Sequence, residues 1–536
     1  MLQIIIKKIA DYGILKNRWW IPLITGLSFA LCLPPFNHEY NPVFAPFPLL
    51  SFVILIPLMF FSMLKPFKKA VLFTFLYSFS AALVQFYWIG FVTAEGLWHL
   101  ILLGLVLISA GIGTVFLIAG MLFRLTIRFT GRFYIVIFPA IWIGIDFLRT
   151  VGDVAFPWSF LGYSLTPFLP VAQFATITGV WGLTYIIVFG NILIWEILLS
   201  YYNNQNQAQK IIHAAIFALF LSGVSVWGYL KLKGPQHTES SHIALLQSNL
   251  DQFHWGNNSL DSAFSITETM VRTAALKKPE LIIGPESALL CFLERRPDLS
   301  SKVKSWATII NTPILLGALH WDKAPPGALY EYIVYNSAFL IEPDTYIMEH
   351  YNKQKLVPFS EKMPFENLFP ILSRVNLGEA DFHSGVDSVV FSPDKKIKGA
   401  PFICYEIIFP SFVQQRLKKG ANLIITMTND GWFGKTSAPY QHAIMARMRA
   451  IENRISVVRC ANSGISMFID PFGRVLKKSE LYTRAVIDGD IQLKTADTFY
   501  SKYGDWFVLI CLLVSVLGIG VAFIIAGLSK KNVADR

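Results

Sequence analysis

Three short segments of the sequence each place a reactive side chain at the end of an apolar run. Glu286 lies in LIIGPES, Lys353 in YNKQKLVPFSE and Cys404 in PFICYE. Functional side chains concentrate where strands end and loops begin. A thiol, an acid and a lysine at three such positions predict acyl transfer through a thioester.

The chemistry assigns a different task to each of these groups. A cysteine near its ordinary pKa is mostly protonated at neutral pH, so it needs a base or a neighbouring cation. Glu286 could take the thiol proton. Lys353 could stabilise first the thiolate and then the tetrahedral oxyanion, an interaction worth roughly 3 kcal/mol. Glu361 and Glu406 are expected to hold Lys353, so that its charge is not unpaired.

Each residue also has a purely structural interpretation, and the residues alone leave both open. Cys404 could be a small core residue at the end of a strand. Glu286 could cap the helix expected after Pro285. Lys353 lies in a run with Lys355 and Lys362, and such charge runs are usually solvated faces.

The remaining cysteines and the histidines argue against a metal or disulfide framework. Cys32 and Cys511 fall in apolar spans, which leaves Cys291, Cys404 and Cys460 for the soluble part, without a CxxC motif. The ten histidines include no HExxH motif and no pair at ligand spacing in the soluble region. We therefore expect no metal and no cofactor.

The composition divides the chain into membrane and soluble parts. Hydrophobic residues make up 54% of the chain, charged residues 15%, and the mean hydropathy is +0.49. We expect a bundle of seven transmembrane helices over 1–230, a soluble catalytic domain over 231–505, and a last helix with its tail over 506–536. The eight expected spans are 19–36, 43–64, 70–93, 97–123, 133–148, 170–199, 211–230 and 506–528.

The positive charges predict the topology. The segments 1–18, 65–69, 124–132, 201–210 and 529–536 hold 4, 3, 3, 1 and 3 Lys/Arg, whereas 37–42, 94–96 and 149–169 hold 0, 0 and 1. This alternation places both termini in the cytoplasm and 231–505 on the opposite side, the periplasm of a two-membrane bacterium. The net charge of +11 lies in these short clusters, so nucleic-acid binding is not expected.

The soluble part alternates between strand-like and helix-like segments, which predicts a layered α/β domain. Expected strands are 242–248, 280–284, 313–319, 334–341, 388–391, 400–404, 422–427, 456–459, 465–469 and 484–488. Expected helices are 258–277, 298–310, 409–419 and 438–453. The stretch 150–169 is expected to form an interfacial arm.

An ordered series of motifs resembles one known family. The motifs are GPESA, YNKQKLVPFSE, ICYEI, TNDGWFG, QHAIMARMRAIE and ANSGIS, preceded by seven expected spans and followed by one. The chain resembles the apolipoprotein N-acyltransferases, membrane members of the nitrilase superfamily. The resemblance implies an αββα sandwich with a triad of Glu286, Lys353 and Cys404. It also implies support from Glu361, Glu406 and Tyr405, and substrate-side positions at Trp255 and Asn336.

The resemblance implies a two-step reaction in a bacterial inner membrane. Cys404 would take a fatty acyl chain from a phospholipid, usually phosphatidylethanolamine, as a thioester. It would then pass the chain to the α-amine of a diacylglyceryl-cysteine apolipoprotein, the final step of lipoprotein maturation. Apolar residues over 363–376 would form a lid, or else pack in the core.

Two alternatives stay open at this point. A membrane-tethered amidase would use the same triad with water as the acceptor, although a seven-helix platform is unnecessary for a soluble amide. A transporter or structural membrane protein would show inverted repeats or intramembrane charges, and only Glu196 interrupts an apolar run in this way. One departure from the family pattern, Gly284 where Trp is frequent, is expected to enlarge the space beside Glu286.

Overall fold

The computed structural model describes two compact units. It covers residues 18–36, 43, 46–92, 98–202, 207–233, 239–251, 257–324, 326, 331–345, 348–366, 368–369, 382–494 and 497–534. The helical unit comprises Met1–Thr150, Pro157–Lys233 and Asp505–Arg536, and the sheet unit comprises Val151–Phe156 and Gly234–Gly504. The short segment Val151–Phe156 therefore belongs to the sheet unit, although it lies in the stretch that the sequence assigns to an interfacial arm.

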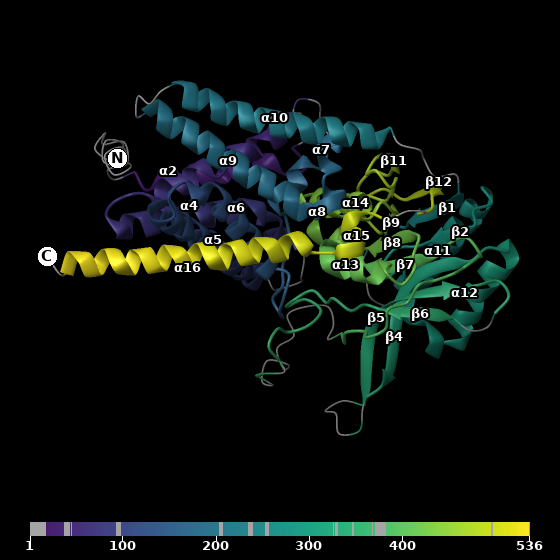
Figure 1. Cartoon of the computed structure of the whole chain (residues 1–536). Helices are drawn as coiled ribbons and strands as arrows, with labels where there is room; N and C mark the ends of the chain where they lie inside the picture. The colour runs from purple at the N-terminus through teal and green to yellow at the C-terminus, as the bar shows by residue number, and fades with distance from the viewer. Residues whose placement is uncertain are drawn as a thin grey trace. The chain divides into compact units, whose positions relative to one another are not determined.

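Long apolar helices build the helical unit (Figure 1). The long helices are α4 (Phe67–Gln85), α5 (Trp98–Phe129), α6 (Tyr134–Leu148), α9 (Val180–Tyr202), α10 (Gln207–Leu232) and α16 (Trp506–Ala534). Shorter elements are α2 (Trp20–Leu27), η1 (Ser28–Cys32), η3 (Phe47–Phe52), α3 (Ile56–Ser62), η4 (Tyr87–Phe91), η5 (Gly131–Phe133), η6 (Leu161–Leu165), α7 (Leu169–Ala172) and α8 (Ala175–Thr178). Helix α6 packs against α5, α9 and α16.

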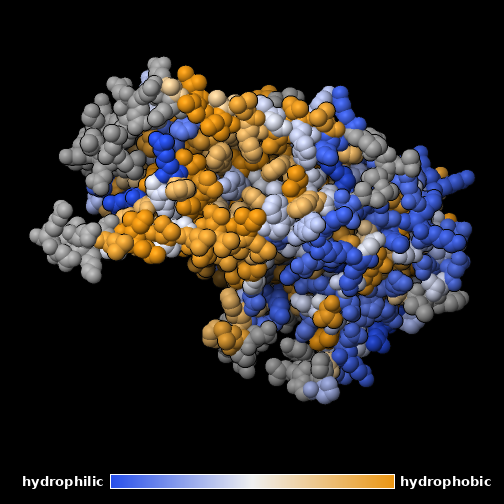
Figure 2. Space-filling model, in the orientation of Figure 1, coloured by the Kyte–Doolittle hydropathy of each residue, from blue (hydrophilic) through white to orange (hydrophobic). Residues whose placement is uncertain are grey.

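The surface of these helices is that of a multi-pass membrane protein. Six helices in the described part of the chain are long and apolar enough to cross a membrane. Large apolar side chains point outward from them, among them Leu107 on α5, Leu219 on α10 and Val516 on α16. Figure 2 shows this apolar surface over the helices, whereas the sheet unit is mostly hydrophilic.

The first two of the eight expected spans differ from the expectation. Over 19–36 and 43–64 the described residues form shorter apolar helices, Trp20–Cys32 and Phe47–Ser62, in which 3-10 turns interrupt the α-helix. Prolines at 46, 48 and 57 lack the amide hydrogen that a continuous helix requires. In the expected span 170–199, Gly179 adopts a φ of 67° and separates α8 from α9. Hydropathy alone does not register these breaks.

Two sheets form the sheet unit. The strands are β1 (Ser240–Gln247), β2 (Leu281–Ile283), β3 (Leu289–Phe292), β4 (Ile314–Lys323), β5 (Tyr332–Ile341), β6 (Glu349–Asn352), β7 (Gly399–Ile403), β8 (Leu423–Thr428), β9 (Ser456–Ala461), β10 (Met467–Ile469), β11 (Val475–Lys478) and β12 (Ala485–Gln492). One sheet has the order β12-β1-β2-β4-β5-β6, with β3 paired to β4. The other has the order β11-β10-β9-β8-β7.

Alternate residues of the strands fill two cores. Leu245 and Ile283 face inward, where they meet Ile425 and Val458 of the second sheet. Their neighbours Leu246 and Ile282 face the helices α11 (Asn257–Ala275) and α12 (Pro297–Ile310). Helix α14 (Ala438–Asn453) packs on β9 of the second sheet. This period of two produces the expected αββα sandwich, and the predicted fold class is confirmed.

The remaining helical elements are short, and a few strands escaped prediction. The helical elements are η7 (Leu293–Arg295), η9 (Cys404–Ile408), α13 (Pro410–Leu417), η10 (Asp430–Phe433) and α15 (Phe499–Tyr503). Strands β3, β6 and β11 were not predicted. The expected strand 388–391 forms only an isolated bridge between Phe391 and Gly399.

Candidate active site

Cys404 lies at a sharp turn between a strand and a helix. Strand β7 ends at Ile403, η9 begins at Cys404, and the φ of Cys404 is 48°. A positive φ is uncommon for a non-glycine residue, and such strain concentrates at functional sites. All five cysteines lie in the described part of the chain, and four of them are buried, whereas the residue Cys404 is partly exposed. Cys404 is therefore the cysteine best placed to meet a substrate.

Glu286 follows β2 and is anchored at both carboxylate oxygens. Its Oε1 accepts hydrogen bonds from Asn336 Nδ2 at 2.8 Å and Lys353 Nζ at 3.1 Å. Its Oε2 accepts from the backbone N–H of Asn429 at 2.9 Å. Gly317 on β4 allows this turn to approach, because a Cβ there would lie 2.6 Å from the Pro285 oxygen. The acid is thus fixed in one orientation.

Lys353 is a buried cation shared by two acids. Its Nζ donates to Glu286 at 3.1 Å and to Glu361 Oε1 at 2.7 Å, and its side chain is 1% exposed. Desolvation alone would lower the pKa of Lys353, but the two carboxylates raise it well above 10.5. Lys353 therefore stays protonated and acts as a fixed positive charge.

Glu361 supports Lys353 as the sequence predicts. Its Oε2 accepts from the backbone N–H of Val357 at 2.8 Å, which closes the loop that carries both residues. Burial and the Glu286 charge raise the pKa of Glu361, and the charge of Lys353 opposes them.

Glu406 has a different contact from the expected one. Instead of meeting Lys353, its fully buried carboxylate binds the chain on both sides of the site. Its Oε1 accepts from the backbone N–H of Gln354 at 2.7 Å and from the Tyr351 hydroxyl at 2.6 Å. Its Oε2 accepts from the backbone N–H of Ile403 at 2.7 Å. Glu406 therefore fastens the segment that follows Lys353 to the residue that precedes Cys404.

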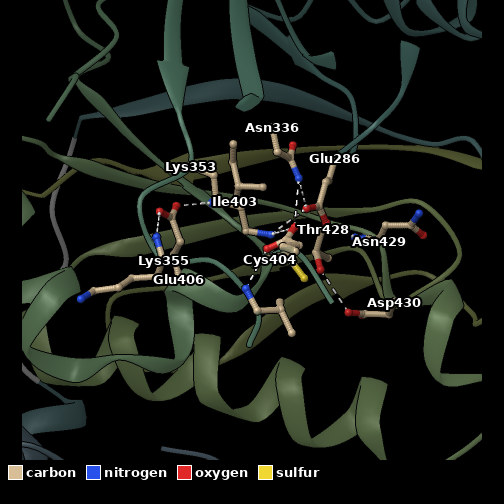
Figure 3. Close-up of polar contacts among 12 residues, drawn as sticks. Glu286, Asn336, Lys353, Lys355, Ile403, Cys404, Glu406, Thr428, Asn429 and Asp430 are labelled. Carbon is tan, nitrogen blue, oxygen red and sulfur yellow. Dashed lines mark hydrogen bonds and ion pairs between the residues drawn. The ribbon is translucent and has the colours of Figure 1, made fainter. Parts of the chain in front are cut away.

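The Cys404 thiol lies within electrostatic reach of both partners. Desolvation and the Glu286 charge raise the pKa of the Cys404 thiol, whereas Lys353 and a hydrogen bond with Thr428 lower it. Figure 3 shows Glu286, Lys353 and Thr428 gathered around the sulfur. The structure thus brings the three predicted catalytic residues together, with the resting sulfur as a neutral thiol.

Tyr405 turns away from the triad toward the segment Val151–Phe156. Its hydroxyl donates to the Ala155 oxygen at 2.5 Å, and its ring stacks on Phe156 with 6.4 Å between centroids. Nearby, the backbone N–H of Phe365 donates to Asp153. This short segment therefore supports the turn that carries Cys404.

The two substrate-side positions have different outcomes. Trp255 lies outside the described residues. Asn336 is buried, and its amide donates to Glu286 and, at 3.4 Å, to Glu361. It lies in the site and holds both acids in place, and its contact with substrate stays a prediction.

Two further predictions concern the apolar segment 363–376 and Gly284. Within 363–376, the apolar residues Phe365, Leu368 and Phe369 are exposed, while Ile371 and Leu372 lie outside the described residues. Gly284 does not enlarge the space beside Glu286. A Cβ there would lie 2.4 Å from Leu316, in the core between the sheet and its helices.

A buried polar network beneath Cys404 was not predicted. Thr428 and Asp430 flank Asn429 in TNDGWFG, and His442 lies in QHAIMARMRAIE. Their contacts join them to Arg459 of β9. The motifs contained the signal, but only the fold shows which residues meet.

One group outside the triad has metal-binding side chains. Potential ligand atoms of Glu294, His320 and His350 lie within 4.8 Å of one another. These residues come from η7, β4 and β6, so sequence spacing does not reveal them. His320 Nδ1 already lies 2.6 Å from Glu294 Oε2, and Nε2 lies 3.3 Å from Asp322. Ion pairing accounts for this arrangement without a metal.

The sequence matches two family descriptions in succession. Residues 25–193 match the apolipoprotein N-acyltransferase N-terminal domain, and residues 242–500 match the carbon-nitrogen hydrolase family. An apolipoprotein N-acyltransferase of Geobacter metallireducens is 32% identical over 72% of this chain and 74% of its own. One of Chlorobaculum tepidum is 30% identical over 73% of this chain and 77% of its own.

Among solved structures, an amidase from Nesterenkonia sp. AN1 is similar at 16% identity. The similarity has a TM-score of 0.36 and covers 49% of this chain and 96% of the amidase. The similarity to each of the two relatives covers more residues than either unit contains, so it extends over both units. The chain belongs to the apolipoprotein N-acyltransferase family.

Proposed function

We propose that this enzyme transfers a fatty acyl chain from a phospholipid, through a thioester on Cys404, to the N-terminal amine of a diacylglyceryl-cysteine apolipoprotein. Lipoprotein N-acylation is what the family relation supports in general. The observation that carries the mechanism is the buried Lys353, bridged between Glu286 and Glu361 beside Cys404, the one cysteine of the five that is partly exposed.

In the first step Glu286 accepts the thiol proton as the sulfur attacks the ester carbonyl carbon of the phospholipid. The π-electron pair of the carbonyl moves to its oxygen, and Lys353 stabilises that negative charge. When the intermediate collapses, the bond to the glyceryl oxygen breaks. The leaving alkoxide takes the proton from Glu286, which yields a lysophospholipid and acyl-Cys404.

In the second step the α-amine of the apolipoprotein attacks the thioester carbonyl. Glu286 accepts a proton from the nitrogen, and the carbon–sulfur bond breaks. The thiolate then recovers the proton, so the products are an amide and the original thiol. Glu286 acts as base and acid in turn, which requires that its carboxylate keep one position throughout.

In this proposal the acyl donor is a membrane lipid and the acceptor is lipid-anchored, and the long apolar helices of the described chain support a location in the same membrane. We further propose a bacterial inner membrane, with the sheet unit in the periplasm, as the charge alternation predicts. The resemblance implies phosphatidylethanolamine as the usual donor, and we propose it as the donor here.

Mass spectrometry of the purified protein after incubation with phosphatidylethanolamine tests the first step. The expected result is one acyl adduct on Cys404, together with an equal amount of lysophospholipid. Cys404→Ala should abolish the adduct. Cys460→Ala is the matched control, because Cys460 is buried between the sheets, where its sulfur donates to the Ile283 oxygen.

A chase tests the second step and separates this enzyme from an amidase. The acyl-enzyme is diluted into buffer with or without a diacylglyceryl-cysteine peptide. The adduct should persist in buffer and disappear with the peptide as N-acyl peptide forms. Rapid release as free fatty acid, whether the peptide is present or absent, would instead indicate a hydrolase and contradict the proposal.

A further inference from the structure

A buried chain of polar side chains ends on the backbone of the nucleophile. Arg459 Nη2 donates to Asp430 Oδ2 at 2.5 Å, and His442 Nδ1 lies 2.9 Å from Asp430 Oδ1. His442 Nε2 lies 3.1 Å from the Cys404 carbonyl oxygen. Arg459, Asp430 and His442 are each at most 1% exposed. The triad chemistry uses none of them.

The contacts determine which nitrogen of His442 carries a proton. A carbonyl oxygen can only accept, so Nε2 is the donor in the contact with Cys404. The Asp430 carboxylate oxygen, 2.9 Å from Nδ1, can likewise only accept, so both contacts are hydrogen bonds when both ring nitrogens carry a proton. Desolvation and the Arg459 charge lower the pKa of His442, whereas the Asp430 charge and hydrogen bond raise it. In this arrangement the histidine donates toward the Cys404 carbonyl.

The peptide bond transmits this contact to the next residue. The carbonyl of Cys404 and the N–H of Tyr405 share one rigid plane and point in opposite directions. A donor that fixes the carbonyl therefore also fixes the direction of that N–H. This matters at Cys404, because its φ of 48° is an orientation that the surrounding structure must maintain.

We propose that His442 is a positioning residue that aims the Tyr405 N–H at the oxygen of the acyl carbonyl when Cys404 attacks. This inference rests on the proposed function. As the carbon–sulfur bond forms and the π electrons move to oxygen, the N–H donates a hydrogen bond to that oxygen, beside Lys353. No proton is transferred by Tyr405 or His442. Arg459 and Asp430 hold the imidazole in its orientation.

A glycine in the ANSGIS motif, Gly464, lies against this network and allows it to be perturbed by a second substitution. A Cβ at Gly464 would lie 2.2 Å from Asp430 Oδ2. Gly464→Ala should therefore displace the Asp430 carboxylate and release His442 without changing any polar group. It offers an independent test of the same network from a different position in the chain.

The experiment compares two reactions of the same sulfur in the full-length protein. Acylation by phosphatidylethanolamine passes through an oxyanion, whereas alkylation by iodoacetamide displaces iodide and forms none. His442→Ala leaves the Tyr405 N–H present but misdirected, so it should lower the acylation rate constant by about 10-fold to about 10²-fold, with KM unchanged; the upper limit is the effect of losing one oxyanion donor outright. Its alkylation rate should stay close to that of the wild type. Gly464→Ala should show the same fall in acylation; because the Asp430 charge also raises the pKa of the Cys404 thiol, its alkylation is compared with that of the wild type across pH.

Two further variants complete the test. His442→Gln keeps an N–H donor at a similar reach and should recover most of the acylation rate. Gln441→Ala removes a buried polar side chain from the same helix and should acylate like the wild type. Equal loss of both reactions in His442→Ala, or normal acylation, would overturn the inference. Absence of an acyl adduct in the wild type would instead refute the proposed function.

Discussion

The resting state of Cys404 is a thiol rather than a thiolate. Burial and the negative charge of Glu286 both raise its pKa, and the Lys353 cation only partly compensates. The nucleophile therefore forms when Glu286 removes the proton during attack. Such a sulfur reacts slowly with electrophiles that arrive without engaging the base, which suits a partly exposed cysteine.

Opposite substitutions around the sulfur should move its pKa in opposite directions. Glu286→Gln removes a charge that raises the pKa of Cys404, so the pH at which the alkylation rate is half its maximum (the midpoint) should shift downward. Lys353→Met removes the charge that lowers the pKa of Cys404, so the midpoint should shift upward. Both variants should lose acyl transfer by at least about 10²-fold. Iodoacetamide kinetics across pH measure the midpoints, and shifts of the same sign would contradict the assigned charges.

The residues of the triad could be predicted from the sequence, but their supports only in part. Glu286, Lys353 and Cys404 each lie in a motif that marks them, but the strands before them, β2, β6 and β7, are not paired with one another and belong to two sheets. Glu361 lies eight residues from Lys353 on one loop, so its contact is local. Asp430 and His442 were in recognised motifs without a role, because a buried network depends on which helix covers which strand.

Among the elements of the fold, β6 and β7 are joined by one carboxylate. Glu406 accepts hydrogen bonds from the chain after β6 and from the last residue of β7, and it is fully buried. The distance between Lys353 and Cys404 thus depends on a residue that touches neither side chain. The sequence could not show this, because the four-residue strand β6 has no clear pattern of its own.

Glu406→Gln should weaken this connection. The NH₂ group of the glutamine side chain would face backbone N–H groups that need an acceptor. The free energy of unfolding should therefore fall by about 2–4 kcal/mol. Glu280→Gln is the control, since Glu280 is partly exposed, accepts from the His242 N–H at 3.2 Å and pairs with Lys396 at 2.8 Å, an ion pair worth less than about 1 kcal/mol. The unfolding midpoint in detergent should fall clearly further for Glu406→Gln, together with acyl-transfer activity. Equal midpoints would contradict the proposed connection.

The cluster of η7, β4 and β6 should make stability depend on pH. Desolvation opposes protonation of His320, but Glu294 and Asp322 raise its pKa above 6.5. Desolvation and the charge of His320 lower the pKa of His350 below 6.5. The stabilising contribution of His320 to the free energy of unfolding is complete below pH 6.5 and is lost as pH rises through its raised pKa. The contribution of His350 to the same free energy grows as pH rises toward 6.5, so the two together favour stability near that pH.

His320→Gln should remove the loss of stability on the alkaline side of pH 6.5. The unfolding midpoints of the variant and the wild type, measured from about pH 6 to about pH 9, should converge as pH rises. A constant difference across this range would show that His320 does not titrate there.

For the whole molecule, composition identified the membrane and soluble parts, but it overestimated the regularity of the first spans. The run 43–64 is apolar throughout, so hydropathy predicts one helix. Prolines 46, 48 and 57 divide it into η3 and α3. For the catalytic domain, the alternation of strands and helices predicted a layered α/β fold, and the resemblance to the family implied the αββα sandwich.

The predicted topology can be tested with single cysteines in a Cys404→Ala background. The other four native cysteines are buried, so they should contribute little labelling. Lys323→Cys lies at the exposed end of β4 and should react with a membrane-impermeant maleimide in intact spheroplasts. A cysteine added after Arg536 should react only after permeabilisation. The reverse pattern would place the sheet unit in the cytoplasm.

The segment Val151–Phe156 limits how this enzyme can be divided. A fragment of residues 234–504 would lose Ala155, which accepts from the Tyr405 hydroxyl, and Phe156, which stacks on that ring. A chimera that exchanges the hydrolase-like domain between homologues would therefore also have to exchange the six residues Val151–Phe156. A chimera without them would combine the nucleophile of one parent with the supporting segment of the other.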